Sequence, residues 1–307
     1  GVILEERNTR VENDPRALFR EQRRAAQFLN HPYGRPIIGW QHEIERLDRD
    51  ALAGFYDRFY APNNAILIVA GDVAPDTVRT LAQEHYGPIR GAADVTVPTR
   101  VDEPPQRAER RLMFRDARIA QPYVIRTYLA PERDPGDQDT AAALTLLADL
   151  LGDGQNAILS RQLQFDSEVA LYTSAFYSGT ARDDTTFGLV VVPAPGVTLQ
   201  DAEQAMDAAV AQFLEDGIDA AHLERLKFRL RADQIYARDD VDGTARRYGR
   251  ALTAGLTVED VQAWPDILQA VNEDDILRAA RAVLDRDTAV TGYLMSEDAP
   301  APEEVTQ

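Results

Sequence analysis

The chain has 307 residues, 44% of them hydrophobic, no cysteine and a formal net charge of −18 at pH 7. This length allows two domains of common size, each with its own core. The lack of cysteine excludes disulfides, thiolate metal sites and a cysteine nucleophile. The acidic balance argues against a nucleic-acid partner, and no apolar run approaches the roughly 18 residues of a membrane span.

The N-terminal residues 1–29 are predicted to form two amphipathic helical segments. An apolar residue recurs at every seventh position, at Leu4, Val11, Leu18 and Ala25. Asp14 and Pro15 mark the joint, because aspartate caps a helix and proline suits its first turn. Glu5 and Glu6 directly follow three apolar residues, so their carboxylates either face solvent or serve a site inside the fold. Composition alone favours a position of both carboxylates on the solvent-exposed face of the helix.

The next part of the chain is predicted to hold a helix, a strand and a second helix. Helices are expected at Arg49–Tyr60 and Pro75–Tyr86, on either side of a buried strand at Ala65–Ala70. The first of these helices carries an apolar stripe that we interpret as core, made of Leu52, Phe55, Tyr56 and Phe59. His31 precedes this region in a turn-rich break and is interpreted as a capping or packing residue.

Proline and charged residues without an apolar period fill the stretch 91–107, which is the best linker candidate in the chain. We therefore predict a first domain at 1–95, a linker at 96–107, a second domain at 108–296 and a disordered tail at 297–307.

The second domain is predicted to mix strands with helices and to end in a mostly helical run. Strands are expected at Arg111–Ile119, Tyr123–Leu129, Val169–Tyr177, Thr186–Val192 and Ala289–Met295. Helices are expected at Asp139–Leu151, Ala157–Phe165, Leu199–Glu215, Asp219–Ala237, Thr244–Ala254, Val258–Trp264 and Asp274–Leu284. Residues 271–290 echo residues 47–66 without a gap, as cap, amphipathic helix, turn and apolar strand. The echo indicates a duplicated α+β domain whose first copy lacks its opening strands and helix.

Three strings carry a family resemblance: GVILEERNTRVENDP, HPYGRPIIGW and FYDRFYAPNNAILIVAGDV. In this order and spacing they resemble the M16 family of zinc peptidases (pitrilysin, insulinase and mitochondrial processing peptidase), and among these the short bacterial members. The resemblance extends from Gly1 to about Met295. It implies an α+β fold of tandem M16-type domains, each a mostly antiparallel sheet packed against helices, with the first domain truncated at its N-terminus.

The resemblance also implies a zinc site. The family binds zinc through a His-x-x-Glu-His motif and a glutamate further along the chain, and this glutamate falls on Glu6, or on Glu5 if the register slips by one. The motif itself is absent, and the four histidines are scattered at His31, His42, His85 and His222. We therefore expect zinc in the full-length protein but no cofactor in this fragment, no catalytic residue in this chain, and a fragment that is inactive alone.

The family's two-subunit enzymes grip peptide with an Arg-x₆-Tyr pair on the partner of the zinc subunit. Tyr172 matches the tyrosine, but Phe165 stands where the arginine belongs, and the pair at Arg229–Tyr236 is interpreted as coincidental. The resemblance thus implies a zinc-type endopeptidase subunit, in a homo- or heterodimeric clamshell with a subunit that carries the pair. Unfolded peptides are the expected substrates, with basic ones favoured by the charge. The alternative is a non-catalytic scaffold or peptide-binding subunit, and the expected location is the periplasm, with the cytoplasm possible.

Overall fold

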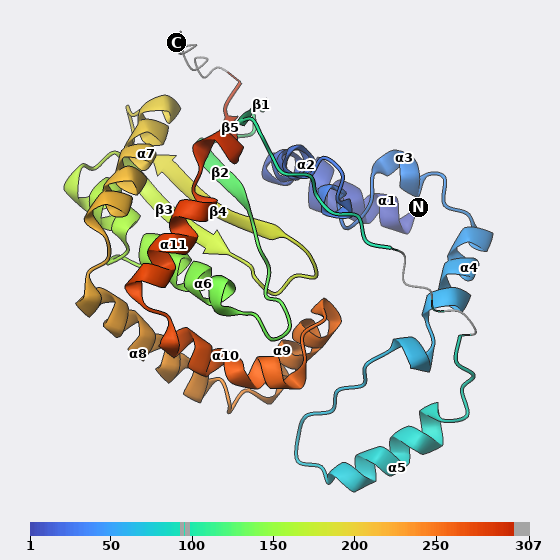
Figure 1. Ribbon diagram of the computed structural model, residues 1–307. Coiled ribbons are helices and arrows are strands. Elements are labelled where there is room, and N and C mark those ends of the chain that lie inside the picture. The colour runs from blue at the N-terminus through green and yellow to red at the C-terminus, as the bar shows by residue number, and fades with distance from the viewer. Residues whose placement is uncertain (93–94, 96–98, 298–307) are drawn as a thin grey trace.

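The computed structural model describes residues 1–92, 95 and 99–297, and helices surround a five-stranded sheet in it (Figure 1). The strands are β1 (Arg110–Arg115), β2 (Tyr123–Ala130), β3 (Ala170–Tyr177), β4 (Thr185–Pro193) and β5 (Ala289–Met295). The helices before the sheet are α1 (Val2–Arg7), α2 (Pro15–Gln27), α3 (Gln41–Ile44), α4 (Arg49–Phe59) and α5 (Pro75–Tyr86). Those that follow β1 are α6 (Asp139–Gly152), α7 (Leu199–Asp216), α8 (Ala220–Tyr236), α9 (Val241–Ala254), α10 (Val258–Ala270) and α11 (Glu273–Val283).

The sheet has the strand order β1-β5-β2-β4-β3, so β3 is an edge strand. Among the described residues the β1–β5 pair alone is parallel, and the other three pairs are antiparallel. The predicted α+β fold with a mostly antiparallel sheet is therefore confirmed. No helix of the described residues combines the length and apolarity that crossing a bilayer requires.

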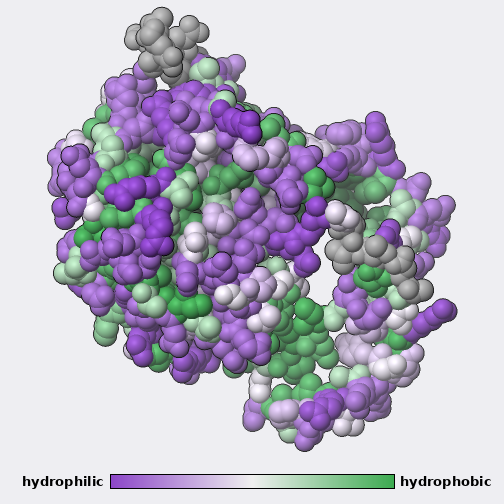
Figure 2. Space-filling model, in the orientation of Figure 1, coloured by the Kyte–Doolittle hydropathy of each residue, from purple (hydrophilic) through white to green (hydrophobic). Residues whose placement is uncertain are grey.

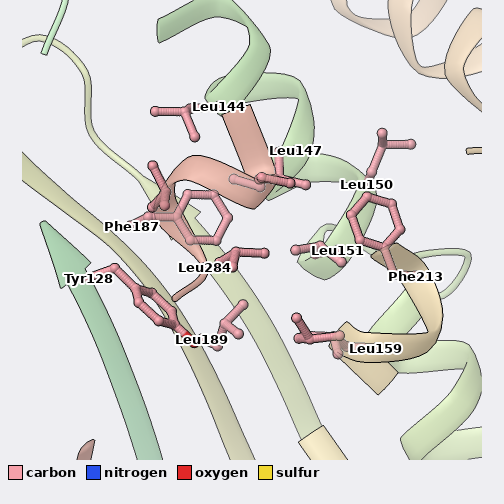
Figure 3. Close-up of a cluster of buried hydrophobic side chains, with 14 of the residues drawn as sticks. Tyr128, Leu144, Leu147, Leu150, Leu151, Leu159, Phe187, Leu189, Phe213 and Leu284 are labelled. Atoms are coloured by element: carbon pink, nitrogen blue, oxygen red, sulfur yellow. The ribbon is translucent and has the colours of Figure 1, made fainter. Parts of the chain in front are cut away.

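The main hydrophobic core lies between the sheet and α6, which packs against β3, α11 and α10. Helix α6 is apolar nearly all round, as a helix buried on every side must be. Figure 3 shows its leucines facing aromatic and aliphatic side chains of the sheet and of the outer helices; the labelled members are Tyr128, Leu144, Leu147, Leu150, Leu151, Leu159, Phe187, Leu189, Phe213 and Leu284. The helix ends at Gly152, where a Cβ would stand 1.8 Å from the Ala175 nitrogen, so only glycine allows this close approach to β3.

The opposite face of the sheet is covered by α2, which contacts β5, β1 and β2. Phe19 of α2 is 1% exposed and its ring lies over Gly292 of β5. The ring centroid of Phe19 is 5.9 Å from that of Phe114 and 5.8 Å from that of Tyr123. A helix assigned by sequence to the first domain thus rests on the sheet of the second. The division into domains stays a prediction, and its positions 93–94, 96–98 and 298–307 lie outside the described residues.

Helices α4 and α5 and the stretch between them extend away from the body of the molecule (Figure 1). Two expectations are wrong here. The strand predicted at Ala65–Ala70 is not formed, and Leu67 is 56% exposed. The predicted core stripe of α4 is open as well, with Phe55 58% and Tyr56 60% exposed, and Figure 2 shows apolar surface over this segment. A strand needs a hydrogen-bonding neighbour, and none of the described residues pairs with this one.

Two other boundaries differ from expectation. Strand β1 ends at Arg115, short of the predicted Ile119, because the Asp116 carboxylate accepts from both the backbone and the side chain of Arg118 and closes a turn. Helix α10 continues through Pro265 to Ala270 instead of ending at Trp264. Its Thr257–Asp260 capping box satisfies the first turn, and its buried face packs on α6 and α8.

Candidate functional site

The two candidate zinc-ligating carboxylates lie on the solvent side of α1. Glu6 forms an ion pair with Arg10 at 2.9 Å, with the two side chains 43% and 71% exposed. Glu5 accepts a long hydrogen bond of 3.4 Å from the Asn8 amide. An exposed ion pair of this i, i+4 type contributes at most about 0.5 kcal/mol, so little free energy would be lost if Glu6 exchanged Arg10 for another cation.

Arg7, the neighbour of Glu6, is buried and fixes α1 to the rest of the molecule. Its guanidinium donates to both Glu21 carboxylate oxygens, at 2.9 and 3.1 Å, and to the Gly39 carbonyl at 2.8 Å. A further ion pair joins it to Glu12 at 3.0 Å. The hydrogen bonds to Glu21 raise the pKa of Arg7. Because successive residues of a helix point in different directions, a buried Arg7 holds Glu6 toward solvent.

The described residues do not make a zinc site by themselves. Nowhere in the described part of the chain do three or more His, Asp, Glu or Cys side chains come close enough to hold a metal ion. His31 is 7% exposed and already committed, since its Nδ1 accepts from the Tyr33 backbone and its Nε2 lies 3.1 Å from Asp183. Catalytic zinc in proteins is held by three side chains. Glu6 can supply one of them at most.

Tyr172, the candidate substrate-binding residue, is 53% exposed on the edge strand β3, next to a bulge that begins at Ala170. It lines a cavity of about 520 Å³ formed by β3, the end of α6 and the π-helical turn η4 (Ser160–Asp166). Phe165, at the position where the family has arginine, is also 53% exposed. No hydrogen bond or ion pair connects Tyr172 to Glu5 or Glu6 among the described residues, so the structure does not join the two predicted sites.

The same cavity is also lined by polar groups that were not predicted from the sequence. The Ser160 and Thr173 hydroxyls are 3.1 Å apart, and the Gln164 amide donates to both, at 3.1 and 2.7 Å. Burial raises the pKa of Asp149 to about 6, and the negative charge of Asp153 acts in the same direction. The one sequence signal for Asp149 is its place as a lone charge within the apolar run LLADLLG.

A second charged cluster lies beneath α7. Arg126 of β2 is 2% exposed, donates to the Thr291 hydroxyl at 2.9 Å and pairs with Glu203 and Asp207 of α7. Glu203 also accepts from Arg111 at 2.5 Å. Because every charge of this cluster has an opposite partner, we interpret it as structural.

The amino-acid sequence of the chain matches a known family and a known protein. A family model described as Peptidase M16 inactive domain matches residues 46–230, more than half of the chain. The zinc protease PqqE of Helicobacter pylori is 25% identical over 301 residues, which cover 95% of this chain and 65% of that protein. The chain therefore spans slightly less than two thirds of the length of this relative.

Solved structures show the same fold. A protease from Helicobacter pylori superimposes with a TM-score of 0.87 and 22% identity, over 95% of this chain and 70% of the other. The periplasmic protease PqqL from Escherichia coli superimposes with a TM-score of 0.79 and 19% identity, over 96% of this chain and 33% of the other. With the family match, these likenesses lead to one conclusion: the chain belongs to the M16 peptidase family, in the part described as its inactive domain.

Proposed function

We propose that the chain is part of a zinc-dependent M16 endopeptidase in which Glu6 is the glutamate ligand, with Glu5 as the alternative. The observation that carries the proposal is the placement of Glu6. Its carboxylate is half-exposed beside the buried Arg7, and among the described residues its one ion-pair partner is the exposed Arg10. The name of PqqE as a zinc protease adds support.

The remaining zinc ligands and the general base are proposed to come from a His-x-x-Glu-His motif encoded upstream of Gly1. Two imidazoles and one carboxylate hold zinc while leaving a position open for water. Since the described residues offer one ligand at most, this 307-residue chain is expected to be inactive alone.

Peptides are the proposed substrates, handled inside a two-subunit clamshell. Tyr172 is exposed on an edge strand, as a peptide-contacting residue must be, but Phe165 cannot replace the missing arginine. We therefore propose a homo- or heterodimer in which another M16 subunit carries the Arg-x₆-Tyr pair. The periplasm is the proposed location, because PqqL of similar fold is a periplasmic protease; the cytoplasm is the alternative.

A second candidate function is that of a non-catalytic M16 scaffold or peptide-binding subunit. One observation favours it: the matching family model is described as an inactive domain. The two candidates differ in one measurable property, which is zinc binding by the product of the whole gene.

The test is the zinc content of that whole gene product, measured by mass spectrometry for the native protein and for Glu6→Gln and Glu5→Gln. We expect about one zinc per chain, lost in Glu6→Gln and retained in the matched Glu5→Gln control. The reverse pattern would move the ligand to Glu5. A native protein without zinc would refute the peptidase proposal and support the scaffold.

A further inference from the structure

A groove runs along α2, where this helix leaves part of the sheet face open. Helix α2 contacts β5, β1 and β2, while β4 and the edge strand β3 continue beyond it. Two cavities of about 430 and 450 Å³ share Arg20 and Arg23 and therefore form one groove. Its lining extends from Gln121, just before β2, to Thr180 in the turn between β3 and β4.

The α2 wall of this groove is cationic. Arg16, Arg20 and Arg23 follow one face of the helix, because spacings of four and seven residues are close to whole turns. Arg24 lies beside this face and lines the second cavity together with Arg20 and Arg23. The Arg23 guanidinium donates to the Thr127 hydroxyl at 3.1 Å, and Arg24 Nε donates to the Tyr33 carbonyl at 2.5 Å. Both acceptors are neutral. The single carboxylate of α2, Glu21, is turned away and buried against Arg7.

No carboxylate within the described residues forms an ion pair with any of these four arginines. Burial lowers the pKa of Arg23 to about 10, and the positive charges of Arg20 and Arg24 lower it further. Burial also lowers the pKa of Arg24. The buried Arg126 differs, since it has two carboxylate partners. A partly buried cation without a counter-ion is unfavourable, so an anionic ligand would gain free energy here by pairing with it.

The floor of the groove is apolar at the end near Gln121. There it is made of Tyr123 and Ile125 from β2 and Val190 and Val192 from β4, with the exposed Tyr172 at its rim. At the other end the lining carries the hydroxyls of Ser178, Thr180, Thr185 and Thr186. Helix α2 has 13 residues, which gives a groove of roughly 20 Å. An extended peptide rises about 3.3 Å per residue, so about six residues fit along it. A row of cations with an aromatic and aliphatic floor at one end favours a ligand that carries carboxylates along its length and apolar side chains at that end.

We propose that this groove binds an extended peptide segment of about six residues, whose carboxylate side chains pair with the α2 arginines and whose apolar side chains lie on Tyr123 and Val192. The proposal rests on the peptide-handling function proposed above and specifies the substrate class. It reverses the expectation from net charge: the overall charge of −18 favours basic peptides, whereas the groove that faces the peptide is positive. Specificity in such a contact is set by the local wall.

The test is a fluorescence-anisotropy titration of the 307-residue chain with three labelled peptides. All are N-acetylated and C-amidated octamers in which leucine and phenylalanine alternate with a variable residue, which is glutamate, glutamine or lysine. Blocked ends leave the side chains as the only carboxylates. The variants are Arg20→Gln, in the groove, and Arg278→Gln, a 74% exposed arginine of α11, as the matched control. Circular dichroism checks that both variants are folded.

We expect the glutamate peptide to bind at least tenfold more tightly than the glutamine and lysine peptides. Arg20→Gln should weaken it about tenfold, as loss of one charge-assisted hydrogen bond does, and Arg278→Gln should not. Raising the salt concentration should weaken it as well. Equal binding of all three peptides would overturn the proposal, and so would full displacement by inorganic phosphate at constant ionic strength or tighter binding of a single-stranded oligonucleotide. Because the titration contains no zinc, its failure and the failure of the zinc proposal are separate results.

Discussion

The docking of α2 on the sheet can be tested through Gly292, because this glycine leaves room for the Phe19 ring. A Cβ at position 292 would stand 2.5 Å from Phe19 Cζ and 3.0 Å from Cε2. Phe19 is 1% exposed and cannot move aside without disturbing its neighbours. Gly292→Ala should therefore destabilise the protein by about 2 kcal/mol, as overpacking does. Phe19→Leu removes the two clashing ring atoms and should cost about 1.5 kcal/mol alone.

The two substitutions together should cost about 1 kcal/mol less than the sum of the single costs, because the shorter side chain makes room for the new methyl group. Urea unfolding followed by circular dichroism gives the four free energies of the cycle. Gly188→Ala is the matched control: its Cβ would meet Phe176, at 2.1 Å, instead of Phe19. Phe19→Leu should not rescue it. If Gly292→Ala has native stability, or if its cost simply adds to that of Phe19→Leu, α2 does not rest on β5.

Two further predictions concern buried charge. Glu203→Gln should lower the free energy of unfolding by about 3 kcal/mol, since it leaves the 2% exposed Arg126 with Asp207 as its remaining carboxylate. A variant with the same urea midpoint of unfolding as the native protein would contradict this. Asp149 has a pKa raised to about 6 by burial, so the folded state binds its proton more tightly than the unfolded state, and stability should fall as pH rises from about 4 to 6. Asp149→Asn should remove this fall and, after allowance for partial exposure, raise the free energy of unfolding at pH 7 by about 1 kcal/mol. If the melting temperature of the variant depends on pH as that of the native protein does, Asp149 is not the group responsible.

The candidate site was only partly predictable. The opening string GVILEER and the family resemblance single out Glu6, and in the structure its carboxylate is half-exposed. The role of Glu6 as a zinc ligand stays a prediction. The Arg7–Glu21 pair joins residues 14 positions apart on two helices. The α2 arginines face a sheet that begins more than 80 residues later in the chain. Neither arrangement has a local signal, because both depend on how distant elements pack.

The two similar segments, residues 47–66 and 271–290, show which features are set by local sequence and which by tertiary packing. Helix α4 begins where the Asp48 side chain accepts from the Ala51 amide, and α11 begins where Asn272 accepts from the Asp275 amide. Both helices were predicted from cap and periodicity, which act within a few residues. The apolar stretches that follow have the same pattern but different outcomes. Ala289–Met295 is a fully buried strand, whereas Ala65–Ala70 is not a strand.

The sequence by itself therefore determined the helix caps, the presence of the helices and of the five strands of the sheet, and the family. The tertiary structure decided which apolar segments are buried. Strand β5 forms because β1 and β2 offer their backbone hydrogen-bonding groups on its two sides, and α2 is held because Gly292 leaves room for Phe19. The physical reason is that helix hydrogen bonds close within four residues, whereas a strand and an ion pair need partners that only the complete fold brings together.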